Sequence, residues 1–265
     1  MNNWQIIPEV IGCNWALRMA SIHAVDAVEQ GRHFIIEGEP GCGRRLLARS
    51  AWCRRAPGTR PLLTVDCRMN GHDGAEALLF GNPAHPSAAK LTLARGGALL
   101  LLHAEHLSPR VQSRLVQLLT SQVRQARGES VQLLLTMATS LEATPALAPA
   151  LLAQLSVIRM PALRERVEDI RAIAEAILRD ASPFRRIRCS QALIERFCAY
   201  DWPGNITELR SVLRRLLMEP HTGLLDVRHL ADLMGRDETC FALMQGSYAG
   251  AMQRGASFAT GGSLQ

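Results

Sequence analysis

Eight consecutive residues between a predicted strand and a predicted helix could bind a phosphate group. They are Gly38, Glu39, Pro40, Gly41, Cys42, Gly43, Arg44 and Arg45. The phosphate-loop template is G-x-x-x-x-G-K-[ST], whose backbone N–H groups face an anion at a helix N-terminus. Gly38 and Gly43 fit this template, and Gly41 adds a permissive backbone, but arginine fills the lysine and hydroxyl positions. We expect a vestigial phosphate loop that keeps positive charge and has no hydroxyl for magnesium. A tight turn kept only for packing is the alternative.

Three smaller signals are each weighed against a plain structural interpretation. His103 and His106 flank Glu105, yet two histidines without a carboxylate at matched depth make a poor metal site, so no metal is expected. Cys42 beside two arginines could be a reactive thiol, but packing inside the loop is favoured. The run FRRIRCS, residues 184–190, together with RSVLRRLL, residues 210–217, could form a patch for an anion or an acidic partner. A solvated helix face is favoured there.

The elements that would position the loop alternate between strand and helix. Apolar strands are predicted at 33–38, 61–67, 96–103, 131–137 and 155–160, with helices at 14–31, 44–54, 74–81 and 108–125 between them. This alternation predicts a parallel sheet covered on both faces. We expect residues 1–165 to form an α/β nucleotide-binding-like domain and 166–235 a helical lid subdomain. The small, polar, glycine-rich segment 236–265 is predicted to be disordered.

Composition limits the function classes. The chain has 265 residues, 48% of them hydrophobic, and a net charge of +6 that comes almost entirely from arginine. A charge of this size is a weak signal for nucleic-acid binding. The seven cysteines form no CxxC pair, which is typical of reduced thiols in the cytoplasm. No signal peptide and no bilayer-spanning apolar run are predicted, so we expect a cytoplasmic protein without a membrane partner.

The order of motifs resembles one family over most of the chain. These motifs are GEPGCG, VDC, LLFG, LARGGALLLL, SPRVQSRLVQLL, MPALRERVEDI and WPGNITELRSVLRR. From about Ile7 to Gly235, the chain resembles the AAA+ domain of bacterial enhancer-binding proteins, the sigma-54-dependent transcriptional activators. The resemblance implies an α/β AAA+ P-loop fold, with a parallel sheet sandwiched by helices and a small all-helical lid subdomain.

The chain departs from that family at the positions that carry its chemistry. The family's strand after the paired glycines ends in Asp-Glu, which hold magnesium and activate water, whereas this strand ends in Leu102 and His103. Glu105 comes two residues too late. The long family loop with the GAFTGA motif is replaced by NPAHPSAAKLTLA, and the segment from Gly81 to Leu91 is predicted not to project. The arginine-finger region has no arginine before Arg159, and the lid arginine is replaced by Thr207.

These departures predict a catalytically inactive module, a pseudo-ATPase without catalytic residues, that acts in transcription regulation by protein–protein interaction. Its partner would be an active enhancer-binding protein or another regulator. Direct DNA binding is not expected without a helix-turn-helix, and the isolated protein is expected to be a monomer or small oligomer. Two alternatives remain. One is a sensor that binds ATP, ADP or a cyclic dinucleotide without hydrolysis; the other is a slow ATPase.

Overall fold

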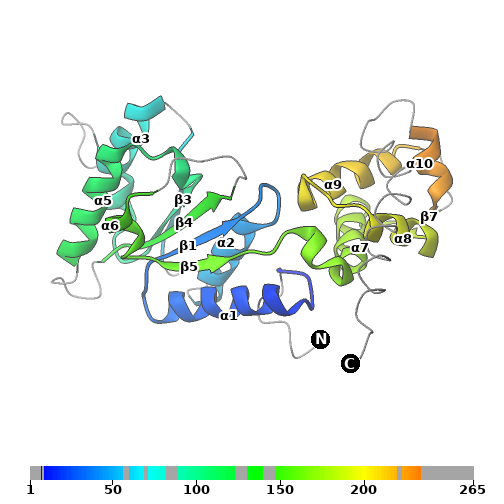
Figure 1. Cartoon of the computed structure of the whole chain (residues 1–265), viewed down its shortest axis with the longest axis horizontal. Helices are drawn as coiled ribbons and strands as arrows, with labels where there is room; N and C mark the ends of the chain where they lie inside the picture. The colour runs from blue at the N-terminus through cyan, green and yellow to red at the C-terminus, as the bar shows by residue number, and fades with distance from the viewer. Residues whose placement is uncertain are drawn as a thin grey trace, which may run out of the picture. The chain divides into compact units, whose positions relative to one another are not determined.

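The chain forms two compact units in the computed structural model (Figure 1). The structure describes residues 7, 9–55, 60–68, 71–81, 89–122, 130–139, 147–219 and 223–233. The first unit contains the chain up to Val10 together with Trp15–Pro161, and the second contains Ile11–Asn14 and the chain from Ala162. The predictions for the tail 236–265, and for most of the loop between Gly81 and Leu91, lie outside the described residues.

A five-stranded parallel sheet is the centre of the first unit. The strands lie in the order β2-β3-β4-β1-β5, so β1 has neighbours on both sides. Continuous apolar runs such as ALLLL form buried strands because helices cover both faces of a parallel sheet. The strands are β1 (Phe34–Gly38), β2 (Leu62–Asp66), β3 (Ala98–Leu102), β4 (Gln132–Ala138) and β5 (Ser156–Arg159).

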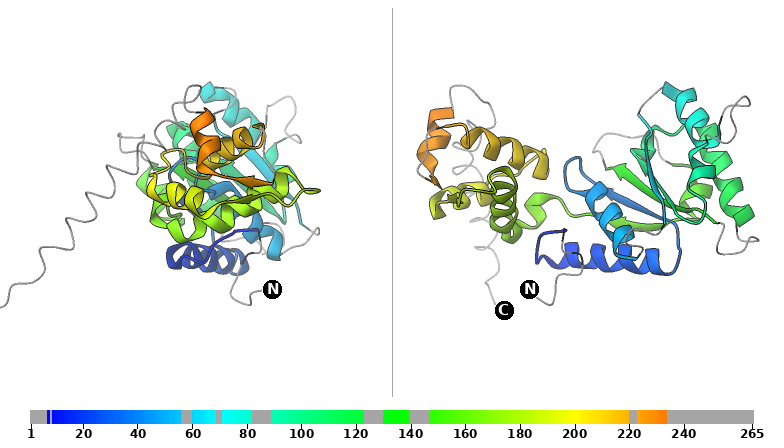
Figure 2. Two further views of the ribbon diagram at one scale, coloured as in Figure 1. Left: turned by 90° about the vertical axis from the view of Figure 1, so that its right-hand side faces the viewer. Right: turned by 180° about the vertical axis from the view of Figure 1, so that it is seen from behind.

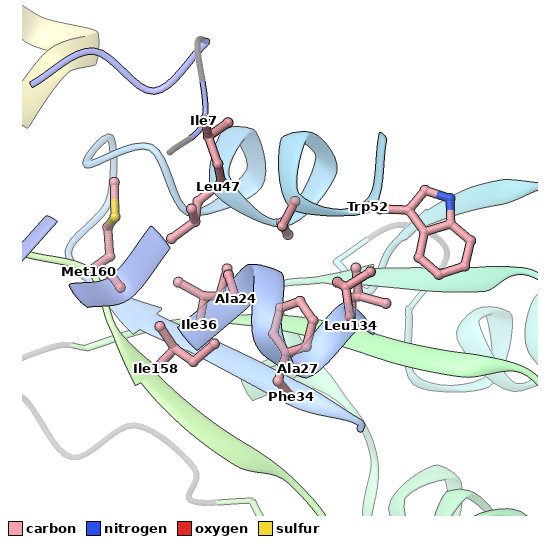
Figure 3. Packing of buried hydrophobic residues seen from close by; sticks show 14 of the residues in the cluster. Ile7, Ala24, Ala27, Phe34, Ile36, Leu47, Trp52, Leu134, Ile158 and Met160 are labelled. Atoms are coloured by element: carbon pink, nitrogen blue, oxygen red, sulfur yellow. The ribbon is translucent and has the colours of Figure 1, made fainter. Parts of the chain in front are cut away.

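Helices cover the two faces of this sheet, as Figures 1 and 2 show. One buried cluster joins α1 and α2 to residues of the strands such as Phe34, Ile36 and Leu134 (Figure 3). A second cluster joins the opposite face to α5 and α6. Each fully buried Leu, Ile or Phe contributes about 1.5–3 kcal/mol. The helices are α1 (Trp15–Glu29), α2 (Arg44–Arg55), α3 (Gly71–Phe80), α4 (Lys90–Leu93), α5 (Pro109–Gln122) and α6 (Pro149–Leu152).

The second unit is built mainly from helices around its own core. The sequence predicts an all-helical unit, but the structure adds two short parallel strands, in which Arg188 pairs with Leu224 and Cys189 with Leu225. Two-residue strands leave no periodicity to detect. The elements are α7 (Ile170–Ala181), β6 (Arg188–Cys189), α8 (Gln191–Ala199), α9 (Asn205–Leu216), β7 (Leu224–Leu225) and α10 (Val227–Leu233).

The WPGN stretch forms a tight turn at the start of α9. Trp202 and Asn205 have positive φ angles of 51° and 54°, a region that residues other than glycine seldom adopt. Both side chains are buried and bonded: the Trp202 indole N–H donates to Phe197 O at 2.7 Å, and Leu163 N donates to Asn205 Oδ1 at 2.7 Å. Burial and these bonds offset the strain of the turn.

Residues Ile11–Asn14, here called the strap, belong to the second unit although they precede α1. The backbone N–H groups of Cys13 and Asn14 donate to Asp169 Oδ1 at 2.6 and 3.3 Å, and Ile11 packs against the core of that unit. The Asn14 amide also donates to Glu168 Oε1 at 2.7 Å. Asp169 is buried, so its carboxylate holds the strap without competition from water.

We expect Asp169→Ala to destabilise the second unit by about 1–3 kcal/mol, because the variant removes the acceptor of two backbone N–H groups. Urea unfolding followed by circular dichroism would measure the loss. The control is Glu168→Ala, which removes an exposed contact of the same strap and should change stability by less than about 0.5 kcal/mol. Equal losses in both variants would contradict the role of Asp169.

Candidate functional site

The phosphate loop follows β1 directly and leads into α2. Gly41 and Gly43 have φ angles of 78° and 109°, which glycine adopts without strain. A β-carbon on Gly38 would lie 2.8 Å from Met160 O, so only glycine fits against the residue that follows β5. Cys42 is fully buried in the core cluster of α1 and α2, which favours its packing role over that of a reactive thiol. Of the other loop residues, Glu39 is half-buried and Pro40 is exposed.

The two arginines that end the loop have different surroundings. Arg44, the first residue of α2, is 7% exposed, and its Nη1 is buried without a hydrogen-bond partner among the described residues. Arg45 is exposed. The first turn of α2 has no acidic residue, and both cations stand at the positive end of the helix dipole. The loop therefore concentrates positive charge where a phosphate would lie.

The end of β3 has no carboxylate. Leu102 is buried and belongs to the same core cluster as Cys42. His103 follows with φ 59° and ψ 51°, and its backbone N–H donates to the Thr136 side chain at 3.3 Å. The tip of β3 thus ends in an apolar side chain and a left-handed turn.

Glu105 is the nearest acidic residue along the chain after β3, and it is buried. It lies on the short 3-10 turn Ala104–His106, and its Oε2 accepts from Ala138 N at 3.3 Å. Its Oε1 lies 3.4 Å from His103 Nδ1. Because Ala138 is paired with Gly38, this carboxylate lies one strand away from the start of the phosphate loop. The sequence did not predict that position.

Asp66 ends β2 beside Leu102 in the sheet register. Its carboxylate is bonded to Arg68, whose guanidinium lies 2.8 Å away and holds the pKa of Asp66 at about 2. Burial, with the charges of Asp66 and Glu105, raises the pKa of the neighbouring Cys67 thiol to about 12, so it stays protonated. Neither residue is a free ligand or nucleophile.

The residues present do not fit a magnesium ion. Magnesium requires oxygen ligands in octahedral geometry, usually carboxylates and waters beside the substrate phosphates. Leu102 is apolar, Arg45 is cationic, and the Glu105 carboxylate is engaged with Ala138 N. Within the part of the chain that the structure describes, no group of three or more His, Cys, Asp or Glu residues could hold a metal ion.

The structure also places two of the residues at which the sequence is predicted to depart from the family. Arg159 lies on the edge strand β5 with its side chain exposed, and Thr207 lies on α9 in the second unit. The segment before Leu147 that would contain arginine fingers lies partly outside the described residues.

Comparison with known families gives the membership of this chain. The model of the sigma-54 interaction domain matches residues 10–147, just over half of the chain. The chain belongs to the sigma-54 interaction domain family. A model of the AAA+ ATPase lid domain matches residues 164–240. The resemblance read from the motifs is confirmed.

Relatives of this sigma-54 interaction domain protein are transcriptional regulators. It is 32% identical over 206 residues to the HTH-type transcriptional regulatory protein TyrR of Enterobacter agglomerans. This match covers 70% of this chain and 40% of TyrR. It is 31% identical over 226 residues to the alginate biosynthesis transcriptional regulatory protein AlgB of Pseudomonas aeruginosa, covering 75% of this chain and 49% of AlgB. The chain thus spans less than half the length of these relatives.

Solved structures confirm the predicted AAA+ fold for this family member. NtrX from Brucella abortus in complex with ADP has a TM-score of 0.71 at 22% identity, covering 83% of this chain and 54% of NtrX. The RuvB Holliday junction branch migration motor of Thermotoga maritima has a TM-score of 0.60 at 15% identity. The match covers 87% of this chain and 72% of the RuvB chain. Among the helices that the structure describes, none has the length and hydrophobicity to cross a membrane.

Proposed function

We propose that this chain is a pseudo-ATPase module of the sigma-54 interaction domain family that acts on transcription through a protein partner. The observation that supports the proposal is the tip of β3, which ends in buried Leu102 and left-handed His103. The resemblance implies an acidic pair at these two positions. Without those carboxylates, neither magnesium nor an attacking water has the ligands that phosphoryl transfer requires.

The proposed partner is an active enhancer-binding protein or another regulator. A retained AAA+ surface would let this chain occupy one position in a relative's assembly, where it would interrupt the cycle of hydrolysis. A protein that regulates transcription would act in the bacterial cytoplasm. In isolation it would be a monomer or small oligomer, because nucleotide-dependent contacts between subunits are weakened without the finger and the intact phosphate loop.

The phosphate loop supports a second part of the proposal, the binding of ATP or ADP without hydrolysis. NtrX, which shares the fold, has been solved with ATP and with ADP. In this chain the loop keeps its glycines, its place after β1 and two arginines at the start of α2. A nucleotide sensor is therefore compatible with the pseudo-ATPase, whereas a cyclic dinucleotide has no structural support beyond the same positive charge.

Titration of this protein into an active sigma-54 activator tests the partner proposal. We expect the ATPase rate of the activator to fall more steeply than its mole fraction, because each inserted subunit disables an interface with each neighbour. Light scattering of the protein alone, with and without ATP, gives the baseline of a monomer or small oligomer. An inert protein at equal concentration is the control. An unchanged rate at large excess would count against this partner.

A further inference from the structure

The cationic charge of the phosphate loop is arranged differently from that of a loop that binds magnesium-nucleotide. The Arg44 residue is only 7% exposed, and its Nη1 has no acceptor among the described residues. A buried cationic donor without a partner is costly, and a phosphate oxygen in the loop would supply the missing acceptor. Arg45 stands next to it at the N-terminus of α2 and adds a second cation.

The residues at and just after the end of β3 offer poor ligands for a metal. Leu102 fills the strand tip with apolar surface, and the Glu105 carboxylate is held by Ala138 N. His103 has its imidazole 3.4 Å from that carboxylate. A magnesium ion on the phosphates would therefore find no carboxylate on Leu102 or His103, and the Glu105 carboxylate already accepts from Ala138 N.

We propose that the loop binds a nucleoside diphosphate or triphosphate in its metal-free form, and that magnesium weakens this binding. The inference rests on the proposed nucleotide binding and adds the form of the ligand. Metal-free phosphates carry more negative charge, which the two arginines neutralise. Magnesium competes with the guanidinium groups for the same phosphate oxygens and gains no protein ligand in exchange.

The test is calorimetric titration of the whole protein with ATP and with ADP, once in EDTA and once in excess magnesium. We expect the Kd for ATP to be about three- to tenfold lower in EDTA, the net effect of one typical hydrogen bond gained. Arg44→Ala should weaken binding in both buffers. The control Arg49→Ala removes an exposed arginine on the same helix and should leave the Kd unchanged.

A variant that restores metal ligands gives the converse test. His103→Glu with Arg45→Thr places a carboxylate and a hydroxyl in the site while leaving the buried Leu102 in place. The His103 side chain is 26% exposed, so a carboxylate there is not forced into the core. In this variant we expect magnesium to strengthen ATP binding, reversing the sign seen in the natural chain.

The outcomes separate this inference from the proposal on which it rests. ATP binding that strengthens with magnesium in the natural chain, or that ignores magnesium, would overturn the inference and leave nucleotide binding intact. An absence of binding in both buffers would overturn nucleotide binding itself, and the inference with it, while the protein-partner proposal would stand. Weaker binding with magnesium, lost in Arg44→Ala, would support the inference.

Discussion

The purified protein is expected to release no phosphate from ATP above a buffer blank, under conditions in which an active sigma-54 activator turns over. Enzymatic phosphoryl transfer depends on positioning and on charge neutralisation by a metal, its ligands and an arginine finger. A finger alone contributes about 10³- to 10⁵-fold. Here the strand tip has Leu102 and His103, and neither side chain offers a carboxylate as a metal ligand.

A coupled phosphate-release assay measures this, with an active relative as the positive control. Arg44→Ala and Glu105→Gln are the diagnostic variants. The first removes the buried cation of the loop, and the second removes the carboxylate one strand away. A steady turnover that disappears in either variant would contradict the pseudo-ATPase and support the slow ATPase instead. A trace of activity equal in all three proteins would indicate contamination.

The second large effect is expected from Trp202→Ala, which should destabilise the second unit by about 3–5 kcal/mol. Trp202 is fully buried, with Phe197 and Tyr200 edge-on to its ring at centroid distances of 5.5 and 5.1 Å. The variant would leave a cavity and remove the indole N–H that donates to Phe197 O. It would also keep a positive φ at residue 202, where alanine is strained as well.

Urea unfolding followed by circular dichroism would show this as an early transition of the second unit. Trp15→Ala is the matched control, because that tryptophan is 70% exposed and its removal should change stability by less than about 0.5 kcal/mol. Comparable losses from the two variants would show that the WPGN turn does not organise the second unit as described.

Local patterns in the sequence predicted the strands and the loop of the first unit well. The run ALLLL is buried on both sides, and GEPGCG follows a strand and precedes a helix, so periodicity and glycine spacing were sufficient. The burial of Leu102 was also readable, because this residue ends the continuous apolar run of β3. These are features in which neighbours along the chain determine the outcome.

Contacts between distant residues could not be predicted in this way. The strap residue Cys13 donates to Asp169 across 156 positions, and no periodicity links the two. Glu105 was judged too late in sequence to matter, yet the 3-10 turn brings its carboxylate to β4. The burial of Arg44 likewise depends on how the loop packs. Charged side chains are usually placed on the surface by sequence reasoning, and this one is an exception.

The strap has a consequence for the order in which the chain folds during synthesis. Cys13 leaves the ribosome 156 residues before its acceptor Asp169 is made, a delay of roughly 8 to 30 s at typical elongation rates. During that interval α1 and the sheet can fold, while the acceptor of the Cys13 and Asn14 backbone N–H groups has not yet been made. The second unit therefore cannot be completed by the segment from Ala162 onward alone, because it must recover Ile11–Asn14 from a stretch made before the sheet of the first unit. A fragment beginning at Ala162 would lack this segment, however well its helices form.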